Sequence, residues 1–373
     1  MQQGSRSSRR SFLHKGAAAA AAFGLSDTLA PLSLAAGSAN RVVVCIYLVG
    51  GNDSNNMIVP LDSPAYDRYA TARGPLALAK DTLLEVRSGS ARYGFHPNLP
   101  GLQDLYNQNA LAVLANVGRT FGAGPAPSDL FLHTGMQVRF LQGGYLGIPW
   151  VTPPASDTGK QGVLPLKHSV TLASADADSK RNHGVADSIG SANFDNRFPN
   201  NMFGQRLSTV FAALQTASFR QQAYVVPLDG FDTHTRQLER QADALQTLND
   251  GLVAFYRAIQ GLGMAESVTI YTDTEFNRAL APNPTGGSEH GWGGHQLILG
   301  GSTLGGQIYG TFPSMQPGGA DDAIGNGTWI PSTSNSQYAA TMAAWYGKRE
   351  LVDVPEYPDW NNPLRPRLNF LAH

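Results

Sequence analysis

The stretch SEHGWGGH at residues 288–295 places a carboxylate and two imidazoles within eight residues, among three glycines and a tryptophan. Imidazole nitrogens and carboxylate oxygens are ligands of zinc and related divalent metals. Glycine lets the backbone turn tightly or approach a ligand closely, although it loses much conformational entropy on folding. The stretch therefore predicts a loop shaped around a metal ion or a substrate, with Glu289, His290 and His295 as candidate metal ligands. The alternative is a chance grouping of polar residues in a turn.

Three polar clusters earlier in the chain carry side chains of the same kinds. They contribute Asp53, the pair Asp232 and His234, and the pair Glu275 and Arg278. Asp232 and His234 are two residues apart, so in an extended segment their side chains point to the same face, which suits chelation. Each cluster also has a structural interpretation. Asp53 could close an Asx-turn, Asp232 could cap a helix, and Glu275 could form an exposed ion pair with Arg278. Together with the glycine–histidine stretch, the clusters favour a metal site.

These clusters follow segments that have the composition of buried strands. Apolar and β-branched runs cover residues 42–49, 111–117, 224–228 and 268–272, and a shorter run covers 297–299. Continuous apolar runs are typical of parallel strands buried on both faces. In open α/β sheets ligands bind beyond the carboxyl ends of the strands. The polar residues that follow these runs are therefore expected to converge at one edge of a sheet.

A long helix is predicted between the third and fourth strands. Apolar residues recur at three- and four-residue intervals from Leu238 to Ile259, and Gly261 and Gly263 close the segment. Strand, helix and strand in this order form a βαβ unit. A late helix is expected at 337–346, and the polar segment 160–201 is expected to be an inserted loop region. The pattern predicts an α/β protein with a mostly parallel sheet flanked by helices.

Residues 1–39 have the organisation of an export signal. Arg9 and Arg10 precede a weakly apolar, alanine-rich run at 16–25, and small residues cluster at 33–39. A charged head, a modest apolar region and a small-residue tail describe a cleaved signal, and paired arginines indicate the twin-arginine route. The alternative is a basic N-terminus followed by an alanine helix. We expect the twin-arginine translocation machinery as a partner, a periplasmic or extracellular location, and one mature domain over residues 40–373.

Composition narrows the classes of partner. Only 15% of the residues are charged and the formal net charge is −1, without a basic stripe, so nucleic acid is not an expected partner. No run after the leader is long and apolar enough to predict a stable membrane span after cleavage. The single cysteine, Cys45, lies within an apolar run and is expected to be buried rather than nucleophilic.

Motifs along nearly the whole mature chain resemble those of a known family. They are LVGGNDSNNMIVP (48–60), FHPNLPGLQDLY (95–106), LDGFDTHTRQ (228–237), YTDTEFNRALAPN (271–283), SEHGWGGHQLILGG (288–301), GQIYGTFP (306–313) and SQYAATMAAWYG (336–347). With the twin-arginine leader, they resemble the DUF1501 family of exported bacterial proteins. That family is assigned to the alkaline phosphatase-like (sulfatase-like) superfamily.

The resemblance implies an alkaline phosphatase-like fold whose strand ends carry two metal ions that activate a nucleophile and bind phosphate or sulfate. A two-metal clamp stabilises the attacking and leaving oxygens of an in-line displacement. The implied cofactors are divalent metal ions (Zn, Mn, Ca or Mg), and three imidazoles favour a transition metal for at least one position. By position, the implied metal-site residues are Asp53 toward the nucleophile, Asp232 and His234 for one ion, Glu289, His290 and His295 for the other, and Glu275 in an assisting role.

The nucleophile is the part of the pattern in which this chain differs. In FLHTGMQ (131–137) relatives commonly have a serine before the histidine, and here the residue is Leu132. Thr134 and Ser128 are the nearest alternatives, and Ser128 is better explained as a helix N-cap. The candidate catalytic residues are therefore Thr134, His133 and Arg278.

Two functions are consistent with these residues. The first is an exported metal-dependent hydrolase of phosphate or sulfate esters, with a small anionic ester as substrate. The second is a non-catalytic envelope binding or assembly protein that retains the fold and part of the metal site. It is motivated by the missing serine and by Glu289, which stands where the superfamily has an aspartate. A metal-free scaffold is a third alternative.

Overall fold

The computed structural model describes residues 41–118, 170–172, 195–216, 222–346 and 368–372. The chain divides into two units, Met1–Ala39 and Asn40–His373, and every described residue lies in the second. The predicted export signal lies outside the described residues, as do the candidate catalytic residues His133 and Thr134. Their predicted roles stay predictions.

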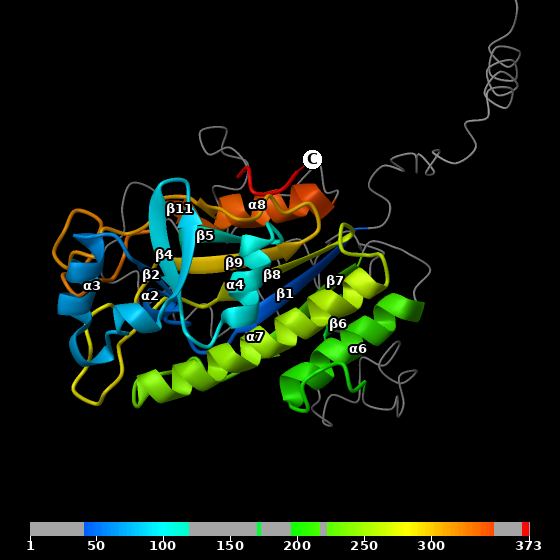
Figure 1. The fold of residues 1–373 in the computed structure, drawn as a ribbon, viewed down its shortest axis with the longest axis horizontal. Coiled ribbons are helices and arrows are strands. Elements are labelled where there is room, and N and C mark those ends of the chain that lie inside the picture. Colours follow the sequence, from blue (N-terminus) through cyan, green and yellow to red (C-terminus); the bar gives the residue numbers. More distant parts are fainter. Residues whose placement is uncertain (1–40, 119–169, 173–194, 217–221, 347–367, 373) are drawn as a thin grey trace, which may run out of the picture. The chain divides into compact units, whose positions relative to one another are not determined.

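A mixed sheet forms the centre of the described unit (Figure 1). The strand order is β10-β5-β9-β8-β1-β7-β6, and β11 also pairs with β5. β7 and β8 lie parallel to β1, and β6 lies parallel to β7, whereas β9 is antiparallel to both of its neighbours, β8 and β5. The bounds are β1 (Val42–Leu48), β5 (Leu111–Gly118), β6 (Val170–Leu172), β7 (Gln222–Leu228), β8 (Val268–Thr274), β9 (Gly294–Gly300), β10 (Ile308–Tyr309) and β11 (Thr333–Ser334).

The direction of β9 is what brings the glycine–histidine stretch to the site. Because β9 is antiparallel to β8, its first residue, Gly294, lies at the edge where β1, β7 and β8 end. Residues 288–293, which precede β9, therefore lie beside the polar residues that follow the other three strands. The apolar run at 297–299 predicted this strand but carried no information about its direction.

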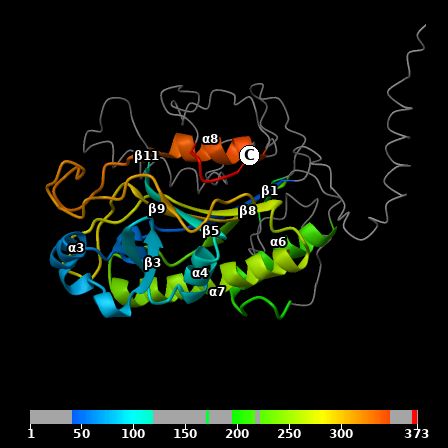
Figure 2. The same cartoon turned by 45° about the horizontal axis from the view of Figure 1, so that its top comes forward.

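Helices cover both faces of the sheet (Figure 2). α4 (Pro100–Asn107), α6 (Met202–Thr216) and α7 (Gln237–Gly261) pack against one face, and α8 (Asn335–Tyr346) packs against the other. Alternate side chains of β1 enter the two cores, with Val44 and Ile46 on the α7 side and Val43 and Cys45 on the α8 side. Burying each of these valine and isoleucine side chains stabilises the fold by about 1.5–3 kcal/mol. The predicted α/β class, mostly parallel sheet, flanking helices and buried Cys45 are confirmed.

Short elements between β1 and β5 were not predicted from the sequence. They form a three-stranded antiparallel sheet in the order β2-β4-β3, together with small helices. The bounds are α2 (Ser54–Met57), β2 (Ile58–Pro60), α3 (Ala65–Arg73), η2 (Gly74–Leu76), η3 (Lys80–Thr82), β3 (Leu84–Ser88) and β4 (Ala91–Phe95). β6 lies inside the segment 160–201, so the prediction of a loop there is wrong at residues 170–172. Most of the rest of that segment is outside the described residues.

None of the helices in the described part of the chain combines the length and the apolar character needed to cross a membrane.

Candidate metal centre

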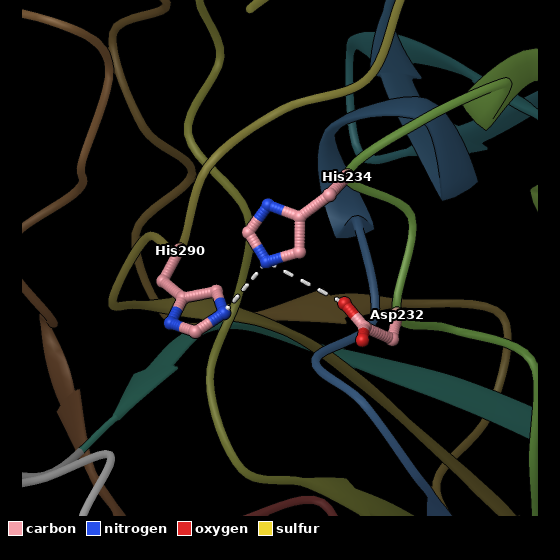
Figure 3. A group of neighbouring side chains, drawn as sticks. All are labelled: Asp232, His234 and His290. Carbon is pink, nitrogen blue, oxygen red and sulfur yellow. Dashed lines mark hydrogen bonds and ion pairs between the residues drawn. The ribbon is translucent and has the colours of Figure 1, made fainter. Parts of the chain in front are cut away.

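Asp232, His234 and His290 gather beyond the carboxyl ends of β1, β7 and β8 (Figure 3). One ligand atom of each lies within 4.8 Å of the others. Nε2 of His234 is 3.0 Å from Nε2 of His290 and 3.5 Å from Oδ1 of Asp232. Two imidazole nitrogens on one tetrahedral zinc ion lie about 3.3 Å apart, given zinc–nitrogen distances of about 2.0–2.1 Å. The three side chains therefore fit a divalent metal ion of this size.

Backbone pairing positions the two segments that carry the histidines. The N–H of Phe231, a fully buried residue, donates to the carbonyl of Val49 at 3.2 Å, which ties the loop after β7 to the loop after β1. Residue 290 forms an antiparallel bridge with Arg278, and the Ala279 N–H donates to the Glu289 carbonyl at 2.9 Å. Residues 56 positions apart in the chain are thereby held at hydrogen-bond distance.

His290 is held in a form suited to metal binding. Burial, followed by the nearby Arg278 charge, lowers the pKa of His290 to about 4. The imidazole is therefore neutral at pH 7, and the neutral form is the one that ligates metals. The Phe276 ring packs against it, with the ring centroids 4.1 Å apart and the planes tilted by 32°. Phe276 thus limits the rotation of the ligand ring.

The glycine pair after β1 makes room for both Asp232 and Phe276. Gly50 has φ +109° and Gly51 has φ +84°, a region that favours glycine. A Cβ on Gly50 would lie 2.4 Å from the backbone nitrogen of Asp232, and a Cβ on Gly51 would lie 2.1 Å from the Phe276 ring. Close approach of these two segments therefore requires glycine at both positions.

Arg278 is a fully buried cation that ties the loops together. Its guanidinium donates to the Asp232 carboxylate at 2.7 Å. Its other N–H groups donate to carbonyl oxygens over 2.7–3.1 Å, and those acceptors are Gly50, Gly51, Phe231 and Ser288. Because these donors point to protein oxygens, the geometry gives Arg278 a positioning role, and the alternative of an exposed ion pair with Glu275 is wrong.

Glu275 is also buried and binds backbone rather than the histidines. Its carboxylate accepts the N–H of Gly50 at 3.0 and 3.2 Å and the N–H of Gly51 at 3.0 Å. Burial raises its pKa, against the opposing effect of these hydrogen bonds. Glu275 therefore holds the glycine turn and lies outside the group of three ligand atoms.

Asp53 has the structural role that the sequence allowed as an alternative. Its Oδ1 accepts the N–H of Asn55 at 3.2 Å and caps α2, and its Oδ2 accepts from Arg73 and Gln237. Both charged side chains of the Asp53–Arg73 pair are fully buried. Burial raises the pKa of Asp53, and the Arg73 charge acts against that rise. The carboxylate is thus occupied by protein donors and is not among the grouped ligand atoms.

His295 also lies away from the group. It is buried in β9, its Nδ1 accepts the backbone N–H of Asn116 at 3.1 Å, and its ring packs on Phe312 with the centroids 4.3 Å apart. Burial lowers its pKa to about 3. Its position in this structure is that of a neutral core histidine.

Glu289 contacts the ring nitrogen of His234 that faces away from the group. Its Oε2 lies 3.2 Å from Nδ1 of His234. Hydrogen bonding, above all from Asn283, lowers the pKa of Glu289. Sequence reasoning missed Asn283 and Phe276. The cluster of proline, asparagine and glycine at 281–287 was the available signal for Asn283, since such clusters form ordered turns.

Three solved structures have a limited likeness to the chain. The C-terminal periplasmic domain of EcEptC from Escherichia coli in complex with Zn has 11% identity over 88% of this chain and 86% of that chain, with a TM-score of 0.38. The soluble domain of lipooligosaccharide phosphoethanolamine transferase A from Neisseria meningitidis has 9% identity over 83% and 89%, with a TM-score of 0.32. Ps i-CgsB in complex with k-i-k-neocarrahexaose has 10% identity over 88% and 77%, with a TM-score of 0.33. At these TM-scores the likenesses do not indicate a shared activity.

No curated protein matches the sequence. A family model does, and it is described as a protein of unknown function, DUF1501. It covers residues 173–326, which include Asp232, His234 and the glycine–histidine stretch. The resemblance predicted from the motifs is therefore confirmed over residues 173–326, which match the DUF1501 family model.

Proposed function

We propose that this chain is an exported metal-dependent hydrolase of phosphate or sulfate esters, with Asp232, His234 and His290 as the ligands of one divalent metal ion. The observation that carries the proposal is the convergence of two imidazole nitrogens and one carboxylate oxygen within 4.8 Å of one another. Two nitrogens facing each other at 3.0 Å, with an acid beside them, fit a shared cation.

The ligand set favours zinc or another transition metal. Imidazole nitrogens suit zinc and its neighbours, whereas calcium and magnesium prefer oxygen ligands. The side chains of Asp232 and His234 are 65% and 38% exposed, so the centre faces solvent on one side. Three protein ligands with an open side are the arrangement of catalytic rather than structural zinc centres.

A divalent ion bound there would supply Lewis-acid polarisation of a phosphoryl or sulfuryl oxygen. The neighbouring side chains hold the three ligands in place. Arg278 fixes the Asp232 carboxylate, Phe276 packs on one face of His290, and Glu289 holds His234. The proposed nucleophile is Thr134, which lies outside the described residues.

Export by the twin-arginine machinery is the second part of the proposal. It is supported by the paired arginines, the alanine-rich run and the small-residue cluster within residues 1–39. A periplasmic or extracellular location follows from such a signal.

One observation favours the second candidate function, a binding or assembly protein without turnover. Arg278 is the cation beside the centre, and its hydrogen bonds go to backbone carbonyls and to Asp232. Its side chain is fully buried, so it is not exposed to an anionic ester at the open side of the centre. A protein that holds one ion and binds a partner through it would retain the same geometry.

The hydrolase proposal is tested by turnover of aryl phosphate monoesters, diesters and sulfates in the presence of Zn, Mn, Ca or Mg. We expect a metal-dependent rate in the wild type and a loss of more than about 100-fold in His290→Ala. Removing a residue that only hydrogen-bonds to a metal ligand lowers activity by about 10–100-fold, and removing the ligand itself should cost more. His96→Asn is the matched control, because His96 is a buried histidine outside the ligand group. Equal rates in the wild type and His290→Ala would contradict the hydrolase function and favour the binding protein.

A further inference from the structure

A turn between β8 and the glycine–histidine stretch is centred on one side-chain amide, that of Asn283. Its Nδ2 donates to Oε1 of Glu289 at 2.8 Å and to the backbone carbonyl of His234 at 2.9 Å. Its Oδ1 accepts the backbone N–H groups of Thr285 at 3.0 Å and Gly287 at 2.9 Å. The turn thus holds the amide, and the amide links the main chain of His234 to the carboxylate of Glu289.

The second oxygen of that carboxylate determines which nitrogen of His234 carries a proton. Oε2 of Glu289 is 3.2 Å from Nδ1 of His234. An ionised carboxylate only accepts hydrogen bonds, so Nδ1 must be the donor. In the neutral ring the lone pair is then on Nε2, the atom that faces His290 and Asp232.

We infer that Asn283 and Glu289 are positioning residues of the metal centre, which hold His234 as the Nδ1–H tautomer and aim its Nε2 at the ion. The inference rests on the proposed metal site at Asp232, His234 and His290, and it gives Glu289 a different role from the ligand predicted from the sequence. Carboxylates that bind the far nitrogen of a ligating histidine orient the ring and raise its basicity.

The geometry separates this role from that of a ligand. The three grouped ligand atoms belong to Asp232, His234 and His290, and no oxygen of Glu289 is among them. Glu289 Oε2 is bound to Nδ1, whose N–H direction diverges from the lone-pair direction of Nε2 across the imidazole ring. The Glu289 side chain is 61% exposed and is held by Asn283, so its place beside His234 depends on this hydrogen bond.

The first test is titration of the metal-free protein with Co²⁺, followed by its visible absorption, and competition of that signal with Zn²⁺. We expect Glu289→Gln and Asn283→Ala to keep the band shape of the wild type and to bind about 10–100-fold more weakly. His290→Ala is expected to lose the signal or change its shape, because it removes a ligand. Glu239→Gln is the matched control, since Glu239 is an exposed glutamate that pairs with Arg236.

Two results of this titration would overturn the inference. A Glu289→Gln spectrum altered in the same way as that of His290→Ala would make Glu289 a ligand. Wild-type affinity in Glu289→Gln would leave the carboxylate without a positioning role. Glu289→Gln keeps the length of the side chain, so the test does not depend on whether Asn283→Ala folds.

The second test reads the tautomer without any metal. Long-range ¹H–¹⁵N correlation of the imidazoles at pH 8, with His234→Asn to assign the signal, is expected to show Nδ1 protonated in the wild type. Glu289→Ala is expected to shift His234 toward the Nε2–H form. A wild-type His234 protonated on Nε2 would contradict the inference.

The outcomes for the inference and for the proposed function are distinct. If the protein shows the predicted spectra and tautomer but no turnover of any ester, the positioning role is supported and the hydrolase function is contradicted. A wild type that binds neither Co²⁺ nor Zn²⁺ contradicts the positioning role itself, whatever its tautomer.

Discussion

Two regions at the same edge of the sheet use the same residue types in opposite ways. In one, Asp232, His234 and His290 are partly exposed and point toward one another. In the other, Asp53 and His295 are buried. Oδ2 of Asp53 and Nδ1 of His295 accept hydrogen bonds from the protein's own donors, and Nε2 of His295 has no such partner but is not among the grouped ligand atoms. An acid or an imidazole after a strand is therefore not enough to identify a ligand. A ligand atom must also be left free by its neighbours and face other ligand atoms.

The largest effect on stability is expected when the buried region is broken. Asp53→Asn leaves the charge of Arg73 buried without its partner, which destabilises a protein by about 3–5 kcal/mol. Denaturant unfolding measures the loss. Asp232→Asn is the comparison. It also removes a carboxylate from a buried arginine, but Asp232 is 65% exposed and Arg278 keeps four backbone carbonyl acceptors, so stability should fall less while metal binding weakens. Similar losses of stability in the two variants would erase the distinction between the regions.

The exposed region is expected to respond in metal affinity rather than in stability. His290→Ala should weaken Zn²⁺ binding by more than about 100-fold, because loss of a residue that only hydrogen-bonds to a ligand already weakens metal binding by about 10–100-fold. His295→Gln should leave the affinity near that of the wild type and destabilise the fold by about 1–3 kcal/mol, since the Asn116 N–H loses a buried acceptor. Calorimetric titration with Zn²⁺ and thermal melting separate the two responses. Loss of Zn²⁺ binding in His295→Gln would place His295 in the metal centre.

The glycine pair Gly50 and Gly51 extends the comparison, because it packs against Asp232 and Phe276 of the exposed region. Gly51→Ala puts a Cβ into the Phe276 ring, so we expect a loss of about 1–3 kcal/mol and weaker metal binding. Gly89→Ala is the matched control, since Gly89 also has a positive φ but no atom within 4 Å of the added Cβ. Metal affinity in Gly89→Ala should not change. Equal effects of the two substitutions would assign the result to backbone strain alone.

The smallest effect is expected for a buried histidine, His96, that belongs to neither region. Burial lowers the pKa of His96 from 6.5 to about 4, so the unfolded state takes up a proton first as the pH falls. The stability that depends on neutral His96 is complete above pH 6.5 and is lost as the pH falls toward 4. This amounts to about 2 kcal/mol between pH 7.5 and pH 5.

His96→Asn tests this dependence while keeping the local hydrogen bond. Nδ1 of His96 accepts the N–H of Asn98 at 3.1 Å, and an asparagine side chain can accept from the same position two residues on. The fall in melting temperature from pH 7.5 to pH 5 should be smaller in the variant than in the wild type. An unchanged fall would assign the acid sensitivity to other groups.

Much of the fold could be predicted because local composition determined it. Apolar runs predicted the five long strands of the sheet, and the spacing from Leu238 to Ile259 predicted α7 nearly to its observed ends, Gln237–Gly261. α8 was predicted at 337–346 and begins at Asn335. The short strands and helices between residues 54 and 95 could not be predicted in the same way. Most of these segments have three to five residues and are too short to show a period. The longest, α3, has nine residues but buries only Tyr69 and Arg73, so it shows no apolar stripe.

The candidate site was predicted in part, for a related reason. The sequence alone determined that acids and imidazoles follow the strands, because that order is covalent, and it determined which runs are apolar enough to be buried. Only the tertiary structure decided that β9 is antiparallel to its neighbours, which brings His290 to His234. Only the tertiary structure placed Arg73 against Asp53 and Glu289 against Nδ1 of His234. The charge state and freedom of a side chain depend on groups that are distant in the chain, and these meet only once the sheet has formed.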